Sequence, residues 1–87
     1  MAQVWVPPPL RPLTGGREQV EVSGRTVGQL IDALDAAYPG TRDRLCADDA
    51  LQPAVTVWVD GRIGHLGLLE PVQDRSEVQF LPAVAGG

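Results

Sequence analysis

The residues best suited to chemistry are the two glycines that close the chain, Gly86 and Gly87. Glycine has no Cβ, so a narrow channel admits it and nothing hinders approach to the carbonyl carbon of Gly87. A terminal carboxyl group has a reference pKa of about 3.3–3.7, so it is ionised at neutral pH. An ionised carboxylate is a poor electrophile. Acyl chemistry at Gly87 would therefore need prior activation, such as adenylation by ATP.

The chain offers little with which to perform that activation. It contains no G-x-S-x-G, Walker or dinucleotide-binding fingerprint, so a partner protein would have to supply ATP and Mg²⁺. A single cysteine, Cys46, and a single histidine, His65, are too few for a redox pair or a protein-only metal site. Cys46 follows an apolar leucine and is most simply a small buried side chain. We expect no metal site, no bound cofactor and no catalytic residue of its own.

Length and charge limit the classes of function. A chain of 87 residues forms one domain, and a domain of this size buries only about 60–65% of its unfolded surface, which leaves little for a deep catalytic cleft. The net charge of −4 argues against nucleic acid as a partner. It suits docking on a basic protein surface, or it only maintains solubility. We expect no membrane contact and a cytoplasmic location, because no apolar run approaches the ~18 residues of a membrane span and the start lacks the basic residues of a signal peptide.

Two strands and a helix are predicted in the first half. Residues 2–6 and 18–22 alternate between apolar and polar, and the loop between them holds a Pro-Pro-Pro run and a Gly-Gly turn, so they form a hairpin. Thr26 and Gln29 form a capping box at the start of a helix, in which each side chain satisfies the other's backbone donor. Pro39-Gly40 ends this helix, Asp32 and Asp35 lie on its solvated side, and a short turn follows over 41–45. The apolar stripe of the helix is Val27, Leu30, Ile31, Leu34 and Tyr38.

The second half continues with strands. Residues 55–59 alternate and end in an Asp-Gly turn, and residues 77–81 alternate again. The stretch between these two segments has the weakest apolar pattern. We expect one further strand within it. The predicted fold is α+β, with a mixed sheet of four to five strands and one main helix across one face.

The end of the chain loses this pattern. Pro82 cannot donate to a strand ladder, and the residues after it are small. We predict a folded domain over 1–81 and a flexible tail over 82–87, which reaches about 14–20 Å when extended. Two terminal glycines arise by chance about once in 200 chains. A Gly-Gly pair on such a tail, behind such a domain, indicates a reaction site.

These features together resemble a known family. The terminal residues 80–87, the helix that Thr26 caps and the strand and turn over 57–61 are similar to the ubiquitin-like β-grasp sulfur carriers of the ThiS/MoaD family. The loop over 10–16 and the terminal Leu-Pro-Ala-Val-Ala-Gly-Gly look closest to the CysO-type branch, which serves thiocarboxylate-dependent cysteine biosynthesis. The family often has an Asp-Gly-Asp turn before the last strand. This chain has Asp74-Arg75-Ser76-Glu77 there, so we expect a different turn geometry.

The resemblance implies a relay of partner enzymes. An E1-like adenylyltransferase of the MoeZ/ThiF type, with or without a rhodanese domain, would activate Gly87, and a persulfide would convert it to a thiocarboxylate. A PLP-dependent cysteine synthase or a thiosugar synthase would then take the sulfur. In the cysteine route, a zinc peptidase of the JAMM type would regenerate the carrier. The tail residues that would thread into partner active sites are Pro82, Ala83, Val84, Ala85 and Gly86.

A partner-binding surface is expected on the sheet face opposite the helix. Exposed aromatic side chains are typical interface anchors, although half-covered rings are also normal on a small domain. The residues that we expect to form this surface are Trp5, Trp58, Gln79, Leu81 and, at its rim, Arg62.

Three functions remain open on sequence alone. The chain is a free sulfur carrier, the small subunit of a molybdopterin synthase, or a ubiquitin-like modifier whose Gly87 is conjugated to lysines. All three functions require the terminal glycine, so the Gly-Gly motif does not distinguish between them. The loop and tail favour the free carrier.

Overall fold

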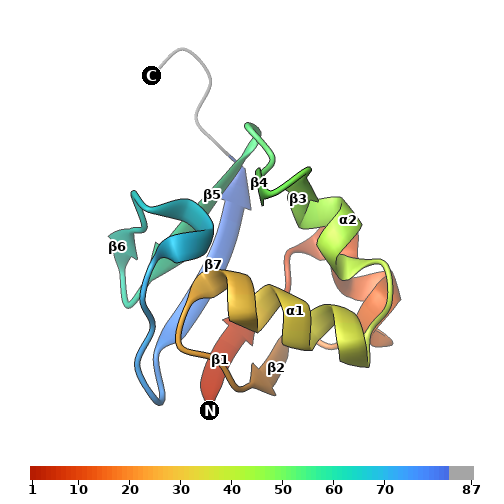
Figure 1. The fold of residues 1–87 in the computed structure, drawn as a ribbon. Helices are drawn as coiled ribbons and strands as arrows, with labels where there is room; N and C mark the ends of the chain where they lie inside the picture. The colour runs from red at the N-terminus through yellow and green to blue at the C-terminus, as the bar shows by residue number, and fades with distance from the viewer. Residues whose placement is uncertain (83–87) are drawn as a thin grey trace.

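The structure, a computed structural model, describes residues 1–82. Its main sheet has five strands in the order β2-β1-β7-β5-β6, and helix α1 (Val27–Ala37) lies across one face (Figure 1). β1 and β7 are parallel, and every other neighbouring pair is antiparallel, so the sheet is mixed, as predicted. The strands are β1 (Ala2–Trp5), β2 (Gln19–Val22), β5 (Val55–Val59), β6 (Arg62–Ile63) and β7 (Glu77–Pro82).

The core forms where the helix stripe meets the inward side chains of the sheet. Fully buried side chains come from α1 and from the three central strands, and Phe80 of β7 joins them at 3% exposure. Burial of such aliphatic side chains is the main source of stability in a domain this small. The largest of these side chains are Leu30, Ile31, Val4, Val27, Val57 and Val78.

The caps of α1 differ in part from the prediction. Thr26 Oγ1 accepts a hydrogen bond from the Gln29 amide at 3.2 Å, as the capping box requires. The Gln29 side chain, however, accepts from the amide of Arg25 at 2.8 Å, one residue before the cap. At the other end Asp35 is half-buried, and its Oδ1 accepts from the amides of Gly40 and Arg42, both at 3.1 Å. Asp35 therefore holds the connection to α2 (Thr41–Leu45) and is not simply solvated.

Several short elements were not predicted. A 3-10 helix, η1 (Pro8–Thr14), replaces the expected loop, and β3 (Cys46–Ala47) pairs with β4 (Ala50–Leu51) in a small separate hairpin. A second 3-10 helix, η2 (Gly67–Leu69), occupies part of the weakly patterned stretch, and β6 supplies its strand. Two-residue strands are too short to show a period. Within residues 1–82, no helix has both the length and the apolar character that a membrane crossing requires.

Candidate functional site at the end of the central strand

The predicted tail leaves from the middle of the sheet. β7 lies between β1 and β5, and its last residue, Pro82, pairs with Val55. Pro82 therefore belongs to the strand, one residue beyond the predicted domain boundary. β1 ends with Trp5, which pairs with Gln79, so beyond that point β5 is the one strand of the described chain that pairs with β7. Proline is tolerated in such an edge segment because no ladder partner needs its missing amide.

The expected reaction site, Gly87, lies in the segment that the structure does not describe. Ala83, Val84, Ala85, Gly86 and Gly87 lie outside the described residues. What the structure supplies is the strand from which they continue and the surfaces around it.

Two of the predicted surface residues are tryptophans that flank one glutamine. In the strand register Trp5 pairs with Gln79, and Gln79 pairs with Trp58, so the three lie in one row across β1, β7 and β5. Their chain neighbours Val4, Val57 and Phe80 are buried beneath α1, so the row lies on the opposite face of the sheet. Both tryptophans are half-buried and Gln79 is exposed.

The row extends to both edges of the sheet. Gln19 of β2 pairs with Trp5, and Ile63 of β6 pairs with Trp58. Leu81, two residues beyond Gln79 on the same strand, lies on this face and is 42% exposed. We call Gln19, Trp5, Gln79, Trp58, Ile63 and Leu81 the outer-face row.

Arg62, which we expected at the rim of this surface, does not lie on the outer face itself. It pairs with Val59, a partly buried side chain that packs against the core, so Arg62 lies at the sheet edge on the helix side. The two-residue turn fixes this register, with Asp60 and Gly61 at φ +52° and +81°. Ile63, 43% exposed, takes the expected place beside Trp58. The sequence carried the signal, because a two-residue Asp-Gly turn pairs position 59 with 62 and position 58 with 63.

The turn that precedes β7 is held by Asp60. Ser76 is 2% exposed, and its Oγ donates to Asp60 Oδ2 at 2.8 Å. The Glu77 amide donates to Asp60 Oδ1 at 2.9 Å, and the Asp60 amide donates back to the Glu77 carbonyl at 2.8 Å. We call this set of bonds the Asp60 clamp. Because it joins the β5–β6 turn to the first residue of β7, it anchors the strand that carries the tail.

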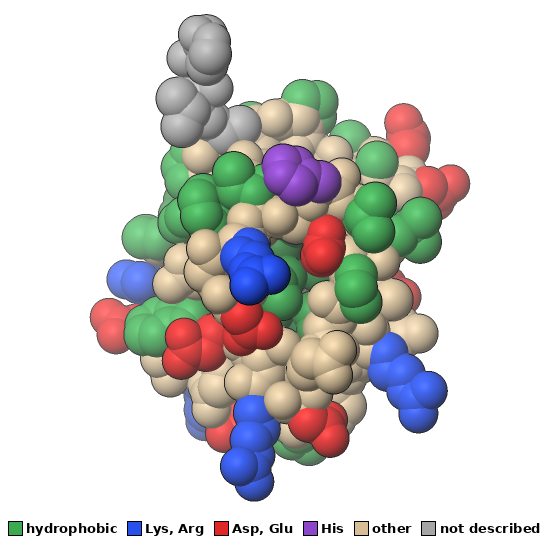
Figure 2. All heavy atoms as spheres, turned by 90° about the vertical axis from the view of Figure 1, so that its left-hand side faces the viewer, with side chains coloured by type: hydrophobic (Ala, Val, Ile, Leu, Met, Phe, Trp, Pro, Cys, Tyr) green, Lys and Arg blue, Asp and Glu red, His purple; other side chains and the backbone are tan. Residues whose placement is uncertain are grey.

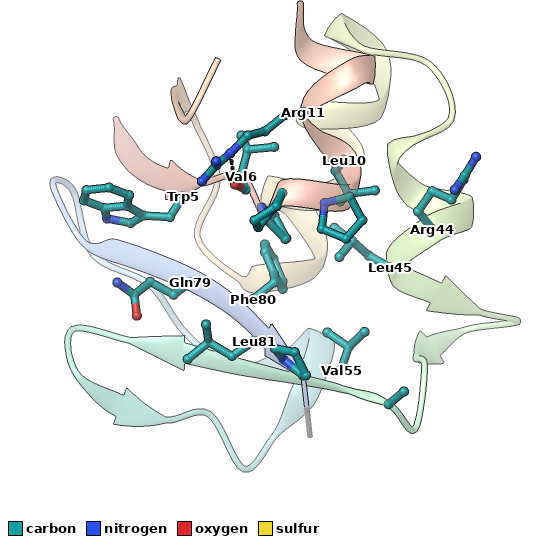
Figure 3. Close-up of a pocket in the computed structure, with 15 residues that line it drawn as sticks. Trp5, Val6, Leu10, Arg11, Arg44, Leu45, Val55, Gln79, Phe80 and Leu81 are labelled. Carbon is teal, nitrogen blue, oxygen red and sulfur yellow. Dashed lines mark hydrogen bonds between the residues drawn. The ribbon is translucent and has the colours of Figure 1, made fainter. Parts of the chain in front are cut away.

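A groove opens beside the end of β7. Its volume is about 460 Å³, and Figure 3 shows side chains from η1, α2, β5 and β7 converging on it. Most of the lining is apolar, and among residues 1–82 only Arg11 and Arg44 contribute charged side chains to it. The indole N–H of Trp5, which also lines the groove, is buried and has no hydrogen-bond partner among the described residues.

The single cysteine is a buried side chain, as expected. Cys46 is free and buried, and burial raises the pKa of its thiol, although the positive charge of Arg42 acts in the opposite direction. A thiol held in its neutral form is a poor nucleophile. Within residues 1–82, no cluster of three or more His, Cys, Asp or Glu side chains could hold a metal ion.

Comparison with known proteins decides the family. The model of the ThiS family matches residues 4–87. The chain belongs to the ThiS family. This match includes the tail residues that the structure does not describe, and it agrees with the resemblance found in the sequence.

The family includes near full-length relatives. The sulfur carrier protein CysO of Mycobacterium tuberculosis is 38% identical over 89 residues, covering 97% of this chain and 96% of that protein. Its crystal structure matches with a TM-score of 0.87 and 34% identity, over 97% of this chain and all of that one. A chain in the crystal structure of the Amycolatopsis orientalis BexX/CysO complex matches with a TM-score of 0.91 and 35% identity, over the whole of both chains. The ThiS-family fold predicted from the sequence, a ubiquitin-like β-grasp, is thereby confirmed.

Two further relatives have names that indicate other roles. The molybdopterin synthase sulfur carrier subunit of M. tuberculosis is 40% identical over 72 residues, covering 82% of this chain and 76% of that protein. Small archaeal modifier protein 3 of Haloferax volcanii is 39% identical over 64 residues, covering 71% of this chain and 70% of that protein. Both matches are shorter than the CysO match.

Proposed function

We propose that this ThiS-family chain is a sulfur carrier of the CysO type, used and regenerated as a co-substrate of other enzymes. The observation that carries the proposal is the match to CysO over 97% of the chain at 38% identity. The position of the tail supports it, because Gly87 follows five residues after the end of the central strand. A short tail on a rigid strand suits delivery of its end into a partner.

The chemistry at Gly87 would take place in steps that partners catalyse. The carboxylate oxygen attacks the α-phosphorus of ATP and expels pyrophosphate, which gives an acyl-adenylate. A persulfide sulfur then attacks the acyl carbon and expels AMP. Reduction of the acyl disulfide by a thiol releases the thiocarboxylate. The partners in this proposal are an E1-like adenylyltransferase with ATP and Mg²⁺, a persulfide donor, and a sulfur-accepting enzyme such as a cysteine synthase or thiosugar synthase.

The outer-face row is the surface that we propose for docking. It spans all five strands of the sheet and continues through Leu81 to the base of the tail. Aromatic residues at the centre of a contact, surrounded by polar ones, are the usual energetic anchors of interfaces. A partner that covers this row would meet the tail where it leaves the sheet.

Two other functions remain candidates, each supported by a relative. The molybdopterin synthase sulfur carrier subunit supports a role as the small subunit of such an enzyme, and the archaeal modifier supports conjugation to lysines. We place them second because both matches cover less of the chain than the CysO match does.

The mass of the intact protein from its own host tests the proposal. The expected result is a fraction of the protein whose mass shows one oxygen replaced by sulfur, located at Gly87. Oxidation of Met1 adds nearly the same mass, so the C-terminal fragment has to be sequenced by mass spectrometry. A variant that lacks Gly87 is the matched control and should fold normally without the sulfur. A tail found only in isopeptide linkage would overturn the carrier proposal in favour of a modifier.

A further inference from the structure

The groove beside β7 exists because β1 stops early. The Pro-Pro-Pro run after Val6 cannot continue the strand, and the chain turns away into η1. Phe80, Leu81 and Pro82 therefore have a strand neighbour on one side only. Side chains of η1 and of the end of α2 form the opposite wall, as Figure 3 shows.

The charge of the groove is opposite to that of the molecule. The protein carries a net charge of −4, yet the charged side chains that the described residues contribute to the lining are Arg11 and Arg44, both positive. Arg11 donates to the Val6 carbonyl and lies 3.7 Å from a carboxylate oxygen of Glu18. Arg44 is exposed and makes no ion pair with any other side chain of residues 1–82. The lining thus suits a short apolar peptide that ends in a negative charge.

One segment of this chain has that composition and begins at the groove. Pro82, which lines the groove, is followed by Ala-Val-Ala-Gly-Gly and a terminal carboxylate. Five residues reach at most about 17 Å, so the carboxylate has enough chain to fold back toward Arg44. A segment tethered at the rim has a high effective concentration, so even weak contacts would populate the bound state.

We propose that this groove binds the C-terminal tail of the same chain, with the Gly87 carboxylate beside Arg44. The bound state is a closed form of the carrier, in which the reactive end is held against its own domain. The tail has to leave the groove before it can enter a partner's active site. Binding of the tail in the groove therefore competes with its insertion into the partner. The proposal concerns the tail that the proposed function uses, but it does not require a thiocarboxylate.

Titration of the Gly87 carboxyl carbon by NMR tests the proposal on the full chain. A neighbouring guanidinium stabilises the carboxylate, so the pKa of this group should lie below the 3.3–3.7 reference range and rise toward it in Arg44→Gln. Arg62→Gln is the matched control, because Arg62 is exposed at the far edge of the sheet and should leave the pKa unchanged.

A second variant tests the apolar contact. Val84→Asp lies outside residues 1–82 and places a charge where the lining is apolar, so it should shift the amide resonances of Leu10, Leu45 and Val55. The proposal is overturned if these resonances do not move and the pKa of Gly87 is equal in wild type and Arg44→Gln. It is also overturned if the groove resonances respond only when a partner enzyme is added, since the groove would then bind the partner. Neither outcome bears on whether Gly87 carries sulfur, which the intact mass decides separately.

Discussion

Arg75 adopts a backbone conformation that is usual for glycine. Its φ is +68°, in the turn that leads into β7. A side chain in this left-handed region costs about 1–2 kcal/mol because Cβ approaches the following carbonyl. The structure nevertheless forms the turn, because the Asp60 clamp holds the residues that follow. The unusual turn sequence is accommodated by strain at one residue.

Replacing Arg75 by glycine should therefore stabilise the protein. Relief of strain outweighs the larger entropy of an unfolded glycine, which costs about 0.5–1 kcal/mol, so Arg75→Gly should raise the free energy of unfolding by about 0.5–1 kcal/mol. Urea denaturation measures this. Asp48→Gly, at φ +56°, is the matched control and should gain less, since aspartate tolerates the conformation better. A loss of stability in Arg75→Gly would show that the arginine side chain supports the turn.

At the scale of elements, the Asp60 clamp connects two turns that are distant in sequence. The carboxylate of Asp60 satisfies the buried hydroxyl of Ser76 and the amide of Glu77 at once. Buried polar groups that lose their partner carry the full cost of desolvation. The first residue of β7 is thus fixed by hydrogen bonds as well as by core packing.

Removal of the carboxylate should destabilise the domain measurably. Asp60→Ala leaves the Ser76 hydroxyl and the Glu77 amide without this partner and places alanine at positive φ, so we expect a loss of about 1–3 kcal/mol. Asp60→Asn keeps one carbonyl acceptor and should lose less. Denaturation curves give the free energies, and faster exchange of the Glu77 amide locates the effect. Equal stability of the alanine variant and the wild type would contradict the clamp.

Elements with a sustained period were predictable, and short ones were not. Helix α1 and strands β5 and β7 repeat their pattern over several residues, and the structure confirms all three. η1 was missed because the three consecutive prolines at 7–9, where it begins, indicate a loop, and β3 and β4 because two residues show no period. The face on which Arg62 lies follows from the register of the Asp60-Gly61 turn, which pairs Arg62 with Val59. The chemistry expected at the tail stays a prediction, because residues 83–87 lie outside the described residues, and the groove depends on where η1 and α2 pack.

The whole molecule presents different surfaces on its two sides. The face opposite α1 carries the outer-face row, while the edge beyond β5 carries exposed apolar side chains of the β6–η2 segment, Leu66 at 61% and Leu69 at 76%. Figure 2 views the molecule from that edge and shows hydrophobic side chains in several groups among charged ones. The outer-face row continues through Leu81 on β7, the strand that carries the tail.

A charge placed at the centre of the outer-face row should weaken partner binding. Gln79 is exposed, so Gln79→Arg should fold normally, while a guanidinium between the two tryptophans should reduce affinity for the activating enzyme by about tenfold, or about 1.4 kcal/mol. Calorimetric titration with that enzyme measures the change. Arg62→Gln, on the opposite face, should bind as the wild type does. If the Arg62 variant loses affinity and the Gln79 variant does not, the interface lies on the helix side.

The position of β7 also has a mechanical consequence. A partner that grips the tail pulls along the axis of the central strand, which is bonded to the parallel β1 on one side and the antiparallel β5 on the other. Inter-strand hydrogen bonds lie across that axis, so a pull along it loads many of them together in shear and does not peel them apart one by one. The hydrogen bonds of β7 therefore resist a pull on its C-terminal end together. Repeated insertion and withdrawal of the tail would leave the domain folded.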